Sequence, residues 1–157
     1  MAGTARKLMR ITVGGCAVFT FFDCIGHPAQ VVGNSMQPTL EGGDARWWKR
    51  DFVWLSKWDL YKCSPGAILT FISPRDKDAV HIKRVTACEN QQVRPTTHPE
   101  WLTDIPKGHY WMEGDNPQHR HDSNVYGPVS AALVKGRATH IIWPPERWQR
   151  LSSKKID

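Results

Sequence analysis

The sequence lacks several patterns that assign a protein to a class at once. No two of its four cysteines, Cys16, Cys24, Cys63 and Cys88, have the CxxC spacing of zinc-binding or thioredoxin-type motifs. A disulfide stays possible, although a chain of 157 residues does not need one. Internal repeats are absent, and no run of basic residues is longer than two. The net charge of +6 is therefore spread along the chain, which speaks against nucleic-acid binding and leaves an anionic membrane surface as the acidic partner.

The chain also lacks a continuous apolar run of the roughly 20 residues that cross a bilayer. Twelve uncharged residues, Ile11 to Phe22, follow a basic, acid-free end and precede Asp23. The stretch from residue 11 to about residue 30 reaches the required length if Asp23 lies at the far headgroup level. We therefore expect residues 1–30 to form a basic segment and an uncleaved membrane anchor, with the basic end on the inner face. A cleaved signal peptide or a mitochondrial presequence is the alternative, because both also begin with basic, acid-free ends.

Beyond that segment no helical pattern is evident, so we expect residues 31–157 to form a mainly β domain. Short apolar runs separated by turn signals predict strands at residues 67–72, 79–87, 110–113 and 137–143. A short helix or strand is expected at 129–133, and a loop over 90–108. The segment 46–62 interleaves aromatic and basic residues, which we interpret as a membrane-proximal strand rather than a platform for single-stranded nucleic acid.

One serine lies where the chain turns sharply, since Ser35 follows Gly33 and precedes Pro38. A serine hydroxyl is a poor nucleophile at neutral pH unless a base removes its proton. The candidate base is Lys83, which on a strand shares a face with His81. Burial lowers the pKa of a lysine by up to about 3–5 units, and a neutral amine accepts the serine proton without a metal or cofactor. The two residues are distant in the sequence, so only the fold can join them.

Three motifs occur here in the order found in type I signal peptidases. The segment Gly33-Asn34-Ser35-Met36-Gln37-Pro38-Thr39-Leu40 resembles their nucleophile box, and Lys83-Arg84-Val85 resembles their general-base box. Gly114-Asp115-Asn116, followed by His121-Asp122-Ser123-Asn124 and Gly127-Pro128-Val129, resembles their last conserved box. The Asp-Ser-Asn sequence and the tail 138–148 are similar to the branch of this family in the mitochondrial inner membrane.

The resemblance implies a signal-peptidase-like β-rich catalytic domain with one N-terminal transmembrane helix. It implies a serine endopeptidase in which Ser35 is the nucleophile and Lys83 the general base. Ser35 and Met36 are then expected at the oxyanion, and Asp122 and Ser123 in support of the local loop. No cofactor, metal or nucleic acid is implied.

The resemblance further implies a protein of the mitochondrial inner membrane whose catalytic domain faces the intermembrane space. The implied substrates are precursors with bipartite presequences, for example cytochrome c1-like proteins, which lose hydrophobic sorting signals after small residues. The implied partners are the lipid bilayer and a similar subunit 1, with which the chain forms a heterodimer.

Three positions depart from the family pattern. Gly33 stands where some members have a hydroxyl residue as a second oxyanion donor. Arg120 stands where a serine often contacts the base; a guanidinium there favours neutral Lys83 by like-charge repulsion but could also obstruct it. An Arg-Gly-Asp turn is replaced by Pro65-Gly66-Ala67.

Four other interpretations compete with this one. The sequence His119-x-His121-Asp122 could hold a metal ion, although a solvated loop explains it more simply. The charge and the tryptophans leave a basic nucleic-acid-binding module as an alternative. A non-catalytic scaffold subunit of the same peptidase complex is another, kept open by Arg120. A self-cleaving repressor uses the same dyad, but an apolar run stands where its helix-turn-helix belongs.

Overall fold

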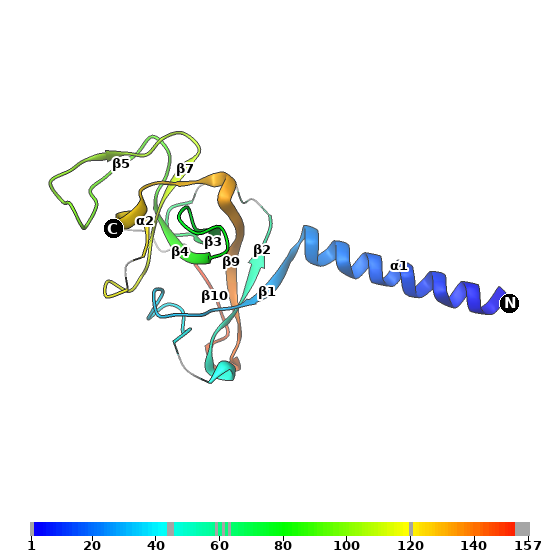
Figure 1. Ribbon diagram of the computed structural model, residues 1–157. Coiled ribbons are helices and arrows are strands. Elements are labelled where there is room, and N and C mark those ends of the chain that lie inside the picture. Colours follow the sequence, from blue (N-terminus) through cyan, green and yellow to red (C-terminus); the bar gives the residue numbers. More distant parts are fainter. Residues whose placement is uncertain are drawn as a thin grey trace.

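A computed structural model describes residues 2–43, 46–58, 60, 62, 64–119 and 121–152 of the chain. Figure 1 shows one long helix, α1 (Ala2–Cys24), that extends away from a β-rich domain. Cys88 is disulfide-bonded, whereas Cys16 and Cys24 on α1 are free thiols. The expected mainly β architecture is confirmed.

The helix is shorter than the anchor expected over residues 1–30, because residues 26–30 lie in the sheet. Gly26 makes this change possible: its φ of 153° and its contact with β2 (Phe52–Ser56) leave no room for a side chain, since a Cβ would lie 2.2 Å from the Leu55 carbonyl oxygen. Lys57 and Asp23 form an ion pair of 3.0 Å that joins the helix end to the domain. Among the helices of the described residues, none combines the length and the hydropathy of a membrane span.

Eight strands form one sheet in the order β1-β2-β9-β3-β4-β7-β8, with β10 paired to β9. Every pairing between neighbours is antiparallel. The strands of this sheet are β1 (Gly26–Gln30), β2 (Phe52–Ser56), β3 (Ile68–Ile72), β4 (Val80–Ala87), β7 (His109–Glu113), β8 (Val129–Ser130), β9 (Val134–Trp143) and β10 (Gln149–Arg150). The helical turns are η1 (Trp47–Lys49), α2 (Ser123–Tyr126), η2 (Ala131–Leu133) and η3 (Pro145–Arg147).

The strands expected from apolar runs between turn residues are confirmed as β3, β4, β7 and β9, although β9 begins earlier, at Val134. The segment 129–133 is both things that were expected, a short strand followed by a helical turn. The segment 90–108 is not entirely a loop, since β5 (Gln92–Val93) pairs with β6 (Thr103–Asp104). The aromatic segment 46–62 contains η1 before the strand β2.

Two large apolar clusters pack on the sheet, beside a smaller one formed by Ala87, Ile105 and Trp111. The first joins β2, β3 and β9 to residues that follow β1: Val31, Met36, Leu40, Val53, Leu55, Ile68, Ala138 and Ile141. The second joins β3, β4, β7, β8 and β9: Ala67, Leu69, Phe71, Val85, Tyr110, Met112, Val129 and Val134. Strand β3 contributes to both clusters, because alternate side chains on a strand point to opposite faces. This double burial fixes β3, and with it the neighbouring strand β4 that carries Lys83.

Candidate active site

The segment after β1 holds Ser35 between three buried apolar side chains. Val31, Met36 and Leu40 are at most 3% exposed and belong to the first core cluster. A backbone hydrogen bond of 2.8 Å from Leu40 N–H to the Met36 carbonyl closes the turn. Because these buried side chains flank it on both sides, Ser35 is positioned at the surface of the core while its side chain stays partly accessible.

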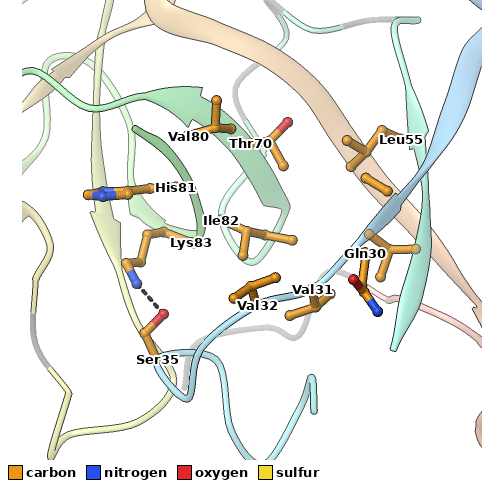
Figure 2. A pocket seen from close by; sticks show the side chains of 12 residues that line it. Gln30, Val31, Val32, Ser35, Leu55, Thr70, Val80, His81, Ile82 and Lys83 are labelled. Carbon is orange, nitrogen blue, oxygen red and sulfur yellow. Dashed lines mark hydrogen bonds between the residues drawn. The ribbon is translucent and has the colours of Figure 1, made fainter. Parts of the chain in front are cut away.

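Lys83 lies in the middle of β4 and is 4% exposed. Its Nζ is hydrogen-bonded to Ser35 Oγ, so the fold joins the two residues that the sequence keeps apart (Figure 2). Figure 2 also shows that Lys83 and His81 point to the same side of β4, as the alternation of side chains on a strand requires.

Burial lowers the pKa of the Lys83 amine from its ordinary value of 10.5, because the charged form loses its hydration. The negative charges of Asp122 and Asp115 act in the opposite direction and raise the pKa of Lys83. Desolvation is the larger effect, so the neutral amine is reached at lower pH than in a solvated lysine. This is the protonation state that a general base needs.

A second loop, between β7 and α2, supports the serine from the other side. Asn116 donates from its backbone N–H to the Ser35 carbonyl at 3.1 Å and from its side-chain Nδ2 to the Asn34 carbonyl at 2.9 Å. Gly114 lies so close that a Cβ there would be 2.5 Å from the Ser35 carbonyl oxygen and 3.7 Å from Lys83 Nζ. Only glycine leaves both residues of the pair in place.

Asp122 and Ser123 hold that loop rather than contacting the hydroxyl of Ser35. Asp122 is 1% exposed and accepts hydrogen bonds of 3.0 Å from the N–H groups of Gly114 and Asn124, the latter capping α2. Ser123 Oγ accepts a hydrogen bond of 2.9 Å from Met112 N–H on β7. Both side chains thus tie the loop to the strand beside β4.

Arg84, the residue after Lys83, connects the β7–α2 loop to the turn at residues 65–67. Its guanidinium donates to both carboxylate oxygens of Asp115, at 2.8 and 2.6 Å, and to the Gly66 carbonyl at 2.9 Å. The replaced turn at residues 65–67 therefore still supplies a carbonyl to the site. Arg120, the other departure from the family pattern, lies outside the described residues.

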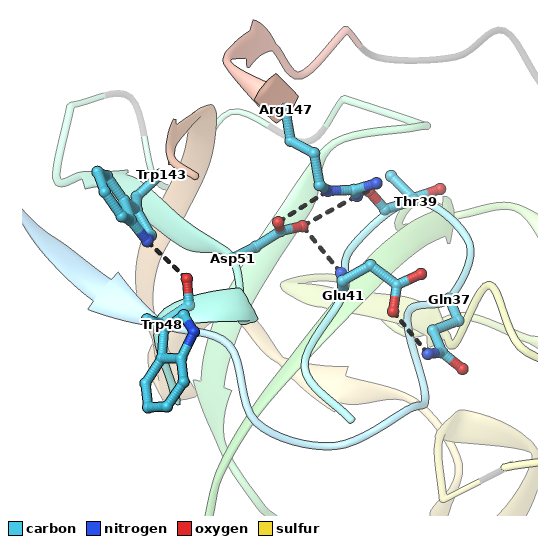
Figure 3. A network of polar contacts seen from close by, with 7 residues as sticks. All are labelled: Gln37, Thr39, Glu41, Trp48, Asp51, Trp143 and Arg147. Atoms are coloured by element: carbon cyan, nitrogen blue, oxygen red, sulfur yellow. Dashed lines mark hydrogen bonds and ion pairs between the residues drawn. The ribbon is translucent and has the colours of Figure 1, made fainter. Parts of the chain in front are cut away.

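The nucleophile segment is also fixed by a polar network on its far side (Figure 3). Asp51 is fully buried and accepts hydrogen bonds from Arg147 at 2.8 and 3.0 Å and from Glu41 N–H at 2.8 Å. Arg147 also donates to the Thr39 carbonyl at 3.1 Å. The network connects the end of the nucleophile segment to β2 and η3, so the position of Ser35 depends on a tail more than 100 residues away.

The backbone N–H groups of Ser35 and Met36 are the donors expected at the oxyanion. Within the described part of the chain, neither donates a hydrogen bond to another residue. Gly33 contributes no side-chain donor, and its φ of 92° is one that glycine adopts readily. An oxyanion site requires donors that are not already engaged, and these two N–H groups meet that requirement.

An apolar pocket of about 270 Å³ opens beside the pair (Figure 2). It is lined mainly by Val31, Val32, Val53, Leu55, Val80 and Ile82, with Ser35 and Lys83 at one end. A pocket of this size and polarity accepts small apolar side chains. Among the described residues, no group of three or more His, Cys, Asp or Glu side chains is arranged to hold a metal ion.

Sequence reasoning named Ser35, Met36, Lys83, Asp122 and Ser123 as the site, and the structure brings all five to one region. It missed the parts played by Asn116 and Gly114, although both belong to the box that resembled the family. It placed His81 on the same strand face as Lys83 but did not include it in the site, where the structure places it beside Lys83.

Comparison with known proteins assigns the chain to a family. The chain matches the family described as signal peptidase, peptidase S26, over residues 5–98 and 89–143. It is 44% identical over 136 residues to mitochondrial inner membrane protease subunit 2 of Mus musculus, covering 85% of this chain and 77% of that protein. It is 35% identical to the protein of the same name from Saccharomyces cerevisiae, covering 94% of this chain and 87% of that protein.

Subunit 1 of the mitochondrial inner membrane protease is also a relative of this chain. The Homo sapiens protein of that name is 32% identical, covering 90% of this chain and 85% of its own length. Similarity to both subunits extends over most of each protein. The chain therefore belongs to the signal peptidase family, peptidase S26, and is a serine hydrolase of the signal-peptidase type.

Proposed function

We propose that the chain is a membrane-bound serine endopeptidase in which Ser35 is the nucleophile and Lys83 the general base. The observation that carries the proposal is the hydrogen bond between Ser35 Oγ and a buried Lys83 amine whose pKa is lowered. No other base lies on this hydroxyl among the described residues, so the lysine alone accounts for its activation.

In the acylation step, neutral Lys83 takes the proton of Ser35 as Oγ attacks the carbonyl carbon of the scissile peptide bond. The carbonyl oxygen becomes an oxyanion, which the backbone N–H groups of Ser35 and Met36 stabilise by about 2.7–4 kcal/mol per donor. The Lys83 ammonium then gives its proton to the leaving nitrogen, and the C–N bond breaks. The product is an ester between the substrate and Ser35.

In the deacylation step, Lys83 is neutral again and takes a proton from a water molecule. The resulting hydroxide attacks the ester carbon, and the same two N–H groups hold the second oxyanion. Ser35 Oγ leaves and receives the proton from Lys83. One amine thus serves as base and acid in both halves of the reaction.

The proposed substrates are precursors delivered to the mitochondrial intermembrane space, from which hydrophobic sorting signals are removed after small residues. The apolar pocket beside Ser35 supports small side chains before the cleaved bond. The names of the relatives support the mitochondrial inner membrane and a complex with subunit 1. Within that membrane we propose α1 as the anchor and the residues that follow it as the peptidase domain facing the intermembrane space.

The test is a processing assay with a precursor that carries a bipartite presequence, in the presence of subunit 1. Ser35→Ala and Lys83→Met are compared with wild type and with two exposed control substitutions, Ser152→Ala and Lys135→Met. We expect both site variants to lose processing and both controls to keep it. Mass spectrometry of the acyl-enzyme should place the substrate fragment on the peptide containing Ser35.

Subunit 1 carries its own potential site, so the assay includes a subunit 1 variant without activity. Processing by Ser35→Ala in that background would end the proposal. If both site variants keep processing with active subunit 1 and no processing occurs with inactive subunit 1, the chain is instead a scaffold that holds an active partner.

A further inference from the structure

A second, more open pocket of about 380 Å³ shares Ser35, His81 and Lys83 with the apolar pocket. Its other lining residues are Gly33, Asn34 and two further histidines, His119 and His121. The histidines come from two separate segments, β4 and the loop between β7 and α2. Among the described residues that line it, none is acidic.

The two pockets adjoin each other at β4. Val80 and Ile82 line the apolar pocket alone, and His119 and His121 line the histidine-lined pocket alone. His81 and Lys83 line both pockets. Ser35 stands between them. A peptide cleaved at Ser35 therefore places the chain on one side of the bond in the apolar pocket and the chain on the other side against the histidines.

The proposed function decides which side of the cleaved bond each pocket takes. Lys83, which gives its proton to the leaving nitrogen, lines both pockets. The apolar pocket takes the small residues before the bond in the proposed function. The first residue after the bond is thus the one whose side chain enters the histidine pocket.

His119 is oriented so that it presents a donor. The Asn116 amide is fixed, because its Nδ2 donates to the Asn34 carbonyl at 2.9 Å and its Oδ1 accepts from Gln118 N–H at 3.0 Å. The same Nδ2 lies 3.3 Å from His119 Nδ1, which must then accept. In the neutral ring the proton is therefore on Nε2.

His81 and His121 form the rest of the wall. Their rings meet edge to face with centroids 5.6 Å apart, and the His81 ring also contacts Phe71 and Tyr126. The His81 Nδ1 is buried without a hydrogen-bond partner among the described residues. Burial lowers the pKa of His81, as do nearby Lys83 and His121, against the opposing effect of Asp76.

Three carboxylates near this wall already accept hydrogen bonds and do not line the pocket. Asp122 accepts from Gly114 and Asn124, and Asp115 is paired with Arg84. Asp76, the carboxylate that acts on His81, accepts from Asp78 N–H at 3.0 Å. Ring N–H donors and the Lys83 amine therefore face a pocket that supplies no anion of its own. A carboxylate is the group that such a pocket binds best, because hydrogen bonds to an ionised acceptor are about twice as strong as neutral ones.

We propose that the pocket formed by His81, His119 and His121 binds an acidic side chain at the first position after the cleaved bond, and so sets part of the substrate specificity. This inference rests on the proposed function, since it needs Ser35 and Lys83 to cleave a peptide. It adds a preference for Asp or Glu at a position that the apolar pocket does not reach.

The test is a set of peptides that differ only in that residue, with Asp against Asn and Glu against Gln, cleaved by the full chain with inactive subunit 1. Each pair has the same shape and differs in charge. We expect kcat/KM to favour the acidic peptide by about 10-fold. His119→Gln and His121→Gln should each reduce that ratio several-fold, whereas His140→Gln, an exposed change on β9, should leave it unaltered.

Each result supports or overturns the inference. A wild-type ratio near one, or a ratio that both pocket variants leave intact, overturns it while peptide cleavage itself upholds the proposed function. A preference that follows an acidic residue at the second position after the bond overturns the assignment of the pocket. Absence of cleavage, or cleavage by Ser35→Ala, removes the proposed function and this inference with it. His119 and His121 are exposed, so thermal unfolding of the variants should match wild type.

Discussion

In the proposed mechanism Lys83 is the general base, and its amine can accept a proton only in the neutral form. Burial lowers the pKa of this amine below 10.5, while Asp122 and Asp115 oppose that shift. We expect kcat/KM to rise with pH as Lys83 loses its proton and to level off below the pH at which an ordinary lysine titrates. Asp115→Asn removes a carboxylate that favours the ammonium, so the rising limb should move to lower pH. A limb that Asp115→Asn leaves in place would contradict the role of Lys83 as the titrating base.

The same burial predicts a stability effect that activity does not measure. Between the folded and the unfolded pKa of Lys83, the unfolded chain binds more protons, so this residue destabilises the fold at neutral pH and does so less as the pH rises. Lys83→Met keeps the apolar stem and removes the charge. We expect a higher Tm at pH 7, by about 2–4 °C for each kcal/mol gained, and a smaller gain near pH 10. The exposed change Lys135→Met gives the baseline, and a lower Tm for Lys83→Met at pH 7 would contradict the argument.

At the scale of elements, the site depends on the close approach of the β7–α2 loop to the nucleophile segment. Gly114→Ala places a Cβ 2.5 Å from the Ser35 carbonyl oxygen, so the segment or the loop must move. A displacement of about 1 Å at reacting atoms costs about 100-fold in rate, and we expect a loss of that size in kcat with the protein still folded. Gly14→Ala on α1 meets nothing within 4 Å and is the matched control. Equal rates for the two variants would show that this approach does not fix the serine.

The network around Asp51 predicts a loss of stability far from the catalytic residues. Arg147→Met leaves a fully buried carboxylate without its charged partner. Breaking a buried ion pair costs about 3–5 kcal/mol, and since the Arg147 side chain is 32% exposed we expect about 2–3 kcal/mol in urea unfolding. Arg150→Met, an exposed arginine on the neighbouring strand, should cost less than about 0.5 kcal/mol. A similar cost for both variants would mean that the network does not stabilise the fold.

The elements differ in how far the sequence predicts them, and the reason is physical. Strands such as β3 and β4 carry their own signal, because their apolar residues are bounded by turn residues. Strand β1, with Gly26 and Pro28, carries none and is defined by its pairing with β2. It was therefore assigned to the anchor.

The site shows the same division. The residue types of Ser35 and Lys83 indicate which of them is a nucleophile and which a base. Their contact, however, comes from the packing of β3 and β4. In the sequence, only the order of the three motifs predicted that contact. His121 was singled out by its motif and His81 by its strand face, but their contact comes from the folding of the chain and no sequence pattern predicted it.

At the scale of the whole molecule, the helix and the sheet are joined at one end only. The last turn of α1 contacts β2, where Phe21 and Trp54 have ring centroids 6.5 Å apart and Asp23 pairs with Lys57. The rest of the helix exposes apolar side chains, among them Ile11 at 72% and Phe19 at 73%. An exposed apolar surface of this extent is usually covered by lipid or by another protein.

If a lipid bilayer covers α1, as we propose, this helix alone should determine membrane attachment. We expect the full chain, expressed without subunit 1, to stay with the membranes after extraction at alkaline pH. A chain that begins at Ile25 should move to the supernatant and remain folded, because the two core clusters contain no residue of α1. Phe19→Lys introduces a charge on the exposed face and should weaken attachment, whereas Thr4→Lys near the basic end should not. Release of the intact chain at alkaline pH would mean that α1 lies against another protein rather than within lipid.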